Sequence, residues 1–213
     1  MKFVESAMSN DFAILALPKQ TQMKNPIPSF LLLFMILVAF QSSAQSLDFF
    51  REDLVFKLDR ESLSVEGEYF FRNLTGTTVE RSLFYPFPQD EDHGSVVWFA
   101  AWPKDDPDSS VVLHKRKQGG NFLASFPPNG YRVYFIGYTQ QLKSGHARYI
   151  LTTTQQWKKP FEVANYKLWV PITLHVDSLS YPPDKADTVK EHVIFKWTKE
   201  NFMPDRDFEI WFK

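Results

Sequence analysis

The clearest pattern in the chain is a two-residue alternation between Tyr166 and Val176. Apolar side chains occupy the even positions there, and mostly polar side chains occupy the odd ones. Successive side chains of a strand point to opposite faces of a sheet, so this segment is predicted to be a β-strand with one buried face. Pro171 lacks a backbone N–H, which leaves three alternatives: an edge strand, a bulge, or two strands bent at Val170–Pro171.

Similar alternation recurs in short runs from Leu54 to the end of the chain, with turn-forming residues between the runs. Short strands separated by regular turns are typical of an antiparallel sandwich or barrel. The sandwich is preferred because most runs supply one apolar face, as two packed sheets require. The predicted fold is therefore all-β, an antiparallel β-sandwich of about ten strands preceded by an N-terminal signal-peptide helix.

Three further predictions concern single segments. Tyr149–Thr154 is rich in aromatic and β-branched residues, which favours a strand, and Trp157–Pro160 is typical of a turn. Tyr131–Leu142 is apolar on both faces, which predicts a central strand covered on both sides. Gly67 interrupts an alternating run and is a candidate β-bulge.

The first 44 residues differ in character from the rest. A basic start at Met23-Lys24 precedes the uncharged run Phe30–Phe40 and a small-x-small end at Ser42–Ala44, which are the parts of a secretory signal peptide. The apolar run is shorter than the about 20 residues that cross a bilayer. We predict residues 1–22 as an upstream extension, 23–44 as a signal peptide cleaved after Ala44, and 45–213 as a single β-sandwich domain. A retained membrane anchor is the alternative.

These segments predict a secreted or periplasmic protein that meets the membrane only through its signal peptide before cleavage. The net charge of −1 provides no basic field for nucleic acid, so no nucleic-acid partner is expected. The chain has no cysteine, which excludes disulfides, cysteine metal sites, a thiol nucleophile and a lipoprotein anchor. The remaining composition, 44% hydrophobic and 23% charged, is that of an ordinary globular protein.

Two stretches resemble a family of secreted bacterial β-sandwich proteins classed as a domain of unknown function. The first is Glu68–Asn73 followed by Leu83–Pro88, which is similar to an early strand pair of that family. The second is Tyr149–Thr154 with Trp157–Pro160, which resembles a Tyr-x-Leu-Thr-Thr-Gly, Trp, Pro block, with Thr154 where the family pattern has Gly. The resemblance implies an exported β-sandwich with no known activity and supplies no catalytic residues.

No pattern of residues points to catalysis, a cofactor or a metal ion. The five histidines are not at metal-ligand spacing, and Gly-x-Ser-x-Gly does not occur. The acidic loops Asp90–Asp92 and Asp105–Asp108 could hold Ca²⁺ only if they met in space, since neither has EF-hand spacing. Solvated polar loops are the simpler interpretation. We therefore expect a protein that is not an enzyme, with no catalytic residues, no metal site and no cofactor.

Tryptophan is the most informative residue type that remains, because all six tryptophans follow residue 44. An exposed planar ring can stack on a sugar or on another protein; burial under a second sheet or a loop is the alternative. The candidate binding residues are Trp157, Trp169, Trp211 and Trp102. The function expected is a non-enzymatic interaction or structural module of the cell envelope with a protein partner. A carbohydrate-binding module that recognises a glycan through exposed aromatics is the alternative.

Overall fold

The computed structural model describes residues 46–108 and 113–213, which form thirteen strands and one short 3-10 helix. In chain order these are β1 (Leu47–Leu58), β2 (Ser62–Asn73), β3 (Val79–Pro86), β4 (His93–Pro103), β5 (Leu113–Arg116), β6 (Gly119–Phe126), β7 (Tyr131–Leu142), β8 (His146–Tyr149), the helix η1 (Thr152–Trp157), β9 (Phe161–Pro171), β10 (Val176–Leu179), β11 (Lys185–Val189), β12 (His192–Phe202) and β13 (Phe208–Phe212). The all-β prediction is confirmed, with more strands than the ten expected.

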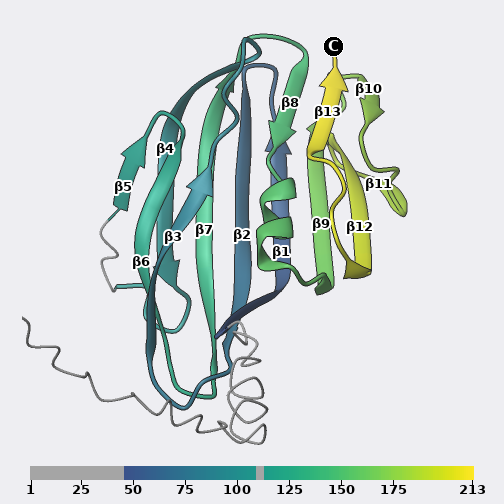
Figure 1. Ribbon diagram of the computed structural model, residues 1–213. Coiled ribbons are helices and arrows are strands. Elements are labelled where there is room, and N and C mark those ends of the chain that lie inside the picture. The colour runs from purple at the N-terminus through teal and green to yellow at the C-terminus, as the bar shows by residue number, and fades with distance from the viewer. Residues whose placement is uncertain (1–45, 109–112) are drawn as a thin grey trace, which may run out of the picture. The chain divides into compact units, whose positions relative to one another are not determined.

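The strands form two layers (Figure 1). One layer is a seven-stranded sheet of order β11-β12-β9-β1-β2-β7-β4, and the other consists of two three-stranded sheets, β3-β6-β5 and β10-β13-β8. All pairs are antiparallel except β1 with β9, which is parallel. The two small sheets cover the same face of the large one, since Phe71 packs on Phe126 and Phe56 stacks on Phe208. This arrangement is the predicted sandwich.

Alternating burial along the long strands places the core between the layers. On β2, Leu63, Val65, Gly67, Tyr69 and Phe71 are all buried, while the residues that alternate with them are partly exposed. Rings from both layers fill the space; the Phe56 and Phe208 rings are parallel within 2°, with centroids 4.7 Å apart. Aromatic pairs of this kind contribute beyond the apolar area that they bury, which accounts for the high phenylalanine content.

The strand predicted between Tyr166 and Val176 is two strands. Strand β9 ends at Pro171 in the large sheet, and β10 begins at Val176 in the other layer. Ile172, which the alternation placed inside, is 56% exposed in the turn between them. Of the three alternatives for Pro171, the bend at Val170–Pro171 is the one observed, because the proline ends the backbone ladder of β9.

The prediction of a strand over Tyr149–Thr154 is wrong beyond its first residue. Strand β8 ends at Tyr149, and Thr152–Trp157 form η1. The Asp207 carboxylate explains the change, because its Oδ1 accepts hydrogen bonds from the backbone N–H groups of Leu151 and Thr152 and from the Thr152 hydroxyl. These bonds hold the backbone in a turn despite its β-propensity. Lys158, at φ 56°, ends the helix in the predicted Trp157–Pro160 turn.

In the pairing of β1 with β2, the β-bulge is on β1 and not at Gly67. The pairing of β2 with both neighbours runs through Gly67 without a shift, whereas the β1–β2 register shifts between Phe49 and Arg51. A Cβ on Gly67 would lie 2.7 Å from the Asp53 carbonyl oxygen, so close backbone approach is what this glycine permits. Strand β7 is covered on one face only, since Tyr131 on the other face is 68% exposed.

The predicted upstream extension and signal peptide, residues 1–44, lie outside the described residues. Among residues 46–108 and 113–213, no helix is long and apolar enough to cross a membrane.

Candidate functional site

The layer built from the two small sheets has a gap in it. Strand β3 is the edge of one small sheet and β8 is the edge of the other. Tyr85 of β3 and Tyr149 of β8 approach across this gap with ring centroids 6.3 Å apart. A cavity of about 370 Å³ lies here, with β3 on one side and η1 on the other. Figure 1 shows β3 and η1 on the same side of the large sheet, in front of β7, β2 and β1.

The floor of the cavity is the inner face of the large sheet, and it contains one acid. Glu52 of β1 lies among Phe49, Tyr69 and Phe71, and its residue surface is 1% exposed. The β1 bulge places it there: Phe49 faces inward, Phe50 and Arg51 are partly exposed, and Glu52 is again inward. Bulges commonly re-aim a side chain in this way next to functional sites.

The Glu52 carboxyl has one protein partner among the described residues. The Tyr166 hydroxyl donates a 2.6 Å hydrogen bond to Glu52 Oε1, and no basic side chain of these residues pairs with the acid. Burial is the main cause that raises the pKa of Glu52 to about 8; the bond from Tyr166 opposes this rise and the nearby Asp53 charge adds to it. Glu52 is therefore mostly a neutral acid at pH 7.

Three tyrosine hydroxyls meet beside this acid. The Tyr69 hydroxyl is 2.7 Å from that of Tyr85 and 3.2 Å from that of Tyr149, so one strand of the large sheet is joined to both small sheets. Burial is the largest cause that raises the pKa of each of these tyrosines well above its usual value, so all three stay protonated. The site thus offers hydroxyl groups and a carboxyl group within an aromatic enclosure.

Trp157, a predicted binding residue, forms part of the wall. Its ring lies at the end of η1 and contacts the rings of Phe49 and Phe71, each with centroids 5.7 Å apart. The cavity continues to the surface, because its lining also includes the exposed residues Phe84 and Gln156. A pocket that has several aromatic walls, holds a few converging polar groups and opens to solvent is the usual form of a small-molecule site.

The other three predicted tryptophans lie elsewhere and do not form one strip with Trp157. Trp102 of β4 stacks on Phe135 at 4.1 Å, on the face of the large sheet that lacks a second layer. Strand β9, which carries Trp169, lies four strand spacings from β4, which carries Trp102. Across the sheet this is about 19 Å at 4.8 Å per strand. Trp211 belongs to β13 in the other layer. Binding by these residues stays a prediction.

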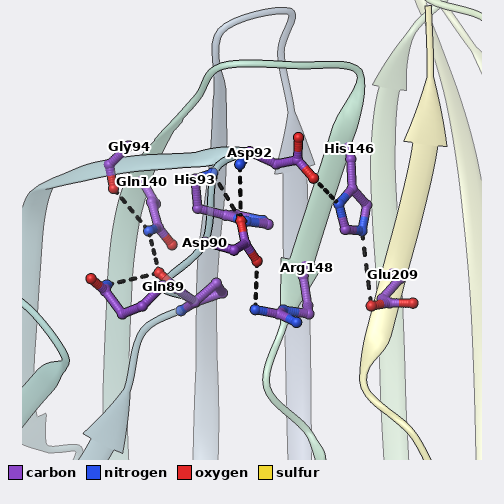
Figure 2. Close-up of polar contacts among 10 residues, drawn as sticks. Gln89, Asp90, Asp92, His93, Gly94, Gln140, His146, Arg148 and Glu209 are labelled. Carbon is purple, nitrogen blue, oxygen red and sulfur yellow. Dashed lines mark hydrogen bonds and ion pairs between the residues drawn. The ribbon is translucent and has the colours of Figure 1, made fainter.

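A second polar cluster lies beyond the cavity and joins the segment before β4 to β8 and β13 (Figure 2). Asp90 pairs with His93 and with Arg148, and Asp92 pairs with His146. Glu209 Oε1 is 3.9 Å from Nε2 of His146. Arg148 balances the charge of Asp90, and Asp92 and Glu209 approach the His146 ring. The acidic side chains of Asp90 and Asp92 are therefore held by protein contacts, whereas the sequence predicted solvated loops.

The electrostatics of this cluster are those of a structural connection. Burial is the largest cause that lowers the pKa of His93, which keeps the ring neutral near pH 7 although Asp90 opposes the shift. Burial alone would raise the pKa of Asp90, but the hydrogen bond with His93 and the charge of Arg148 lower it overall. Trp211 stacks on the His146 ring at 5.1 Å and covers that side of the cluster.

Metal binding finds no support in the geometry. In the part of the chain that the structure describes, no three His, Cys, Asp or Glu side chains are grouped as a metal ion would require. Asp105, from the other acidic loop, pairs with Arg132 and does not meet Asp90. The polar chemistry available at the cavity is hydrogen bonding and charge pairing through Glu52 and the tyrosine hydroxyls.

Residues 137–211 match the family model of Domain of unknown function (DUF4424). This range contains the Tyr149–Pro160 block, and the match confirms that this part of the chain resembles a family of unknown function. The earlier stretches of the resemblance, Glu68–Asn73 and Leu83–Pro88, lie outside the matched range. No curated protein matches the sequence.

Similarity to solved structures extends over more of the chain than the match to the family model does. The chain is similar to a Legionella pneumophila protein provisionally described as nutrient binding, with 14% identity, a TM-score of 0.63, and coverage of 78% of this chain and 67% of that one. It is also similar to an M1 zinc metallopeptidase from Deinococcus radiodurans, with 10% identity and a TM-score of 0.52. That match covers 78% of this chain but only 42% of the peptidase. At these identities the likeness shows the fold alone.

Sequence reasoning missed Glu52, although a signal for it existed. Glu52 occupies an even-numbered position of β1, as do the buried Leu54, Phe56 and Leu58. The alternation of the strand alone therefore places its carboxyl on the inward face. An acid at an inward position of a strand is unusual enough to mark a candidate site. The cavity beside it could not be found in this way, because it depends on how two separate sheets meet.

Proposed function

We propose that this protein is an exported, non-enzymatic binding protein of the cell envelope that takes up a small molecule in the cavity between β3 and η1. The observation that carries the proposal is the buried Glu52 carboxyl on the floor of an aromatic cavity that reaches the surface. Burying an acid without a basic partner destabilises a fold, so its presence is best accounted for by a ligand that uses it.

The size and lining of the cavity support a small ligand. About 370 Å³ falls within the range of known small-molecule pockets, and the rings of Phe49, Tyr69 and Trp157 supply apolar contact. The similarity in fold to a protein described as nutrient binding agrees with this role and does not identify the ligand. The acidic loop Asp90–Asp92, which the sequence offered for Ca²⁺, instead has its aspartates in contact with Arg148, His93 and His146.

The test is a thermal-shift screen of a metabolite library against three proteins. Thr153→Trp places a large ring on the wall of the cavity, and Thr188→Trp, on the exposed strand β11, is the matched control. We expect compounds that raise the Tm of the wild type and of Thr188→Trp but not that of Thr153→Trp. Hits that Thr153→Trp retains, or a library without hits, would contradict the proposal.

Export is tested separately. The proposed secreted or periplasmic location depends on cleavage after Ala44, with the membrane involved only until the signal peptide is removed. Expression of the full chain in a Gram-negative host, followed by fractionation and N-terminal sequencing, should recover a periplasmic protein that begins at Gln45. A cytoplasmic protein that retains residues 23–44 would contradict this location.

Glycan binding on the open face of the large sheet is a second candidate function. The stacked rings of Trp102 and Phe135 lie beside a groove of about 570 Å³ whose lining includes Glu66, Glu68 and Asn165. Planar rings next to hydrogen-bonding side chains suit a sugar.

Affinity electrophoresis in gels that contain soluble polysaccharides tests glycan binding. The polysaccharide should retard the wild type and not Trp102→Ala, and equal migration of the two proteins in every gel would contradict this candidate function. If a protein partner binds the same face instead, it should bind the wild type in the absence of any glycan and should not bind Trp102→Ala.

A further inference from the structure

We infer that the ligand of the cavity between β3 and η1 carries a positively charged amine, which pairs with Glu52 against the surrounding aromatic rings. The inference rests on the proposed function and names the chemical class of the ligand. It follows from the position of the acid, the absence of a basic partner among the described residues, and the nature of the walls.

The Glu52 carboxyl is buried and has no basic partner among the described residues. Buried charges in proteins are paired, because an isolated charge in a low-dielectric interior is strongly unfavourable. Glu52 has the Tyr166 hydroxyl on Oε1, and among the described residues no hydrogen bond reaches Oε2. The Tyr166 hydroxyl thus orients one oxygen of the carboxyl group, and the other oxygen has no counter-charge from the described residues.

The rings of Phe49, Tyr69, Tyr149 and Trp157 line the same cavity as Glu52. Aromatic faces attract cations, and the attraction is stronger where water is excluded. An ammonium group beside Glu52 would therefore gain both an ion pair and cation–π contacts, which a neutral hydroxyl group in its place would not.

The other titratable groups that face the site are mainly tyrosines. Burial is the largest cause that raises the pKa of Tyr166 well above its usual value, as it does for Tyr69, Tyr85 and Tyr149, so all four contribute hydroxyl dipoles and no charge. Asp53 lies next to Glu52 on the opposite face of β1, where Arg51 pairs with it at 2.6 Å, so these two charges largely offset one another. Arg81 is the basic residue in the cavity lining; it is exposed, so water and salt screen its charge.

Binding of a cation would change the protonation of Glu52. A cation binds the ionised form of Glu52, so binding displaces the proton that the buried acid holds at neutral pH. Affinity should then rise with pH up to the pKa of Glu52 and level off above it. A neutral ligand that accepts a hydrogen bond from the acid would show the opposite dependence.

Isothermal calorimetry with benzylamine and its neutral isostere benzyl alcohol tests this, at pH 6, 7 and 8 and in two buffers of different ionisation enthalpy. We expect benzylamine to bind at least tenfold more tightly than benzyl alcohol at pH 8. Its affinity should rise by up to about tenfold per pH unit, with proton release at pH 7. Glu52→Gln should bind benzylamine at least tenfold more weakly than the wild type does.

Equal binding of the two compounds, affinity that does not rise with pH, or no binding of benzylamine would each overturn the inference. Should Glu52→Gln fail to fold, the comparison of the two compounds on the wild type still decides. The proposed function can hold even if the inference fails. Library hits that are neutral or anionic, and that Thr153→Trp blocks, would support the cavity as a binding site and would contradict an amine as its ligand.

Discussion

The Tyr166 hydroxyl of β9 donates a 2.6 Å hydrogen bond to Glu52 Oε1 of β1, and the two residues are 114 positions apart in the chain. Strands β1 and β9 are the one parallel pair of the large sheet, with Leu54 opposite Tyr166. This pairing places the tyrosine beside the buried acid, so a sheet contact between distant segments fixes the orientation of the carboxyl group. The proposed binding site depends on that orientation.

Glu52 should make the protein less stable as pH rises. Its pKa is raised from 4.5 to about 8 on folding, so between these values the folded state holds a proton that the unfolded state has lost. The free energy of unfolding therefore falls with pH, by up to about 1.4 kcal/mol per unit. His93 has the opposite dependence below its usual pKa of 6.5, because burial lowers its pKa. The clearest window is pH 6.5 to 8.

Urea unfolding across that window measures the effect. The free energy of unfolding of Glu52→Gln should be nearly constant over the pH range in which that of the wild type declines. The stability of the variant relative to the wild type should therefore increase steadily with pH. Glu80→Gln, at an exposed position on β3, serves as the control and should follow the wild type. Parallel curves for Glu52→Gln and the wild type would mean that the acid is not buried.

Asp207 should hold the wall of the cavity. Its Oδ1 accepts three hydrogen bonds at the start of η1, so Asp207→Ala leaves the N–H groups of Leu151 and Thr152 without partners. We expect a loss of about 1–3 kcal/mol in stability and faster amide exchange at these two residues. Asp205→Ala, which removes exposed contacts only, should leave exchange there unchanged. Unchanged exchange in Asp207→Ala would contradict this role.

Trp157 should matter for both stability and binding. Truncation to alanine removes ring contacts with Phe49 and Phe71 and opens the cavity, at an expected cost of about 2–3 kcal/mol. Compounds that raise the Tm of the wild type should lose most of their effect. Trp169→Ala, which removes an edge contact with His192, is the matched control. If both variants keep the ligand shifts, Trp157 is not part of the site.

Asp90→Asn should weaken the cluster of Figure 2 without affecting the cavity. The change removes the charge that pairs with Arg148 and accepts from His93, and we expect a loss of about 1–3 kcal/mol in stability at pH 7. Ligand-induced Tm shifts should be retained, because Asp90 does not line the cavity beside Glu52. Loss of the shifts would place the functional site at this cluster instead.

Period-two patterning predicted the sandwich because one inward face per strand is a local property. It could not predict where a strand stops. Thr152 and its neighbours have strand-forming side chains, yet Asp207, 55 residues later, holds them in a helix. Likewise Pro171 allowed three outcomes, and the choice between them depended on the second layer.

The candidate site was predictable only in part. Trp157 was identified from residue type, and the structure places it on the cavity wall. Trp102 and Trp169 lie on the same face of the large sheet but four strands apart, and Trp211 lies in the other layer. The alternation gives the face of a strand and not its position in the sheet. The cavity itself arises where two sheets meet without pairing, a relationship that no local pattern encodes.

The most direct test is a crystal structure of the protein with the library compound that raises its Tm most. The account predicts that the compound lies between β3 and η1, within hydrogen-bond distance of Glu52 and in contact with Trp157. A compound bound on the open face beside Trp102, or a cavity that stays empty while the compound binds elsewhere, would contradict it.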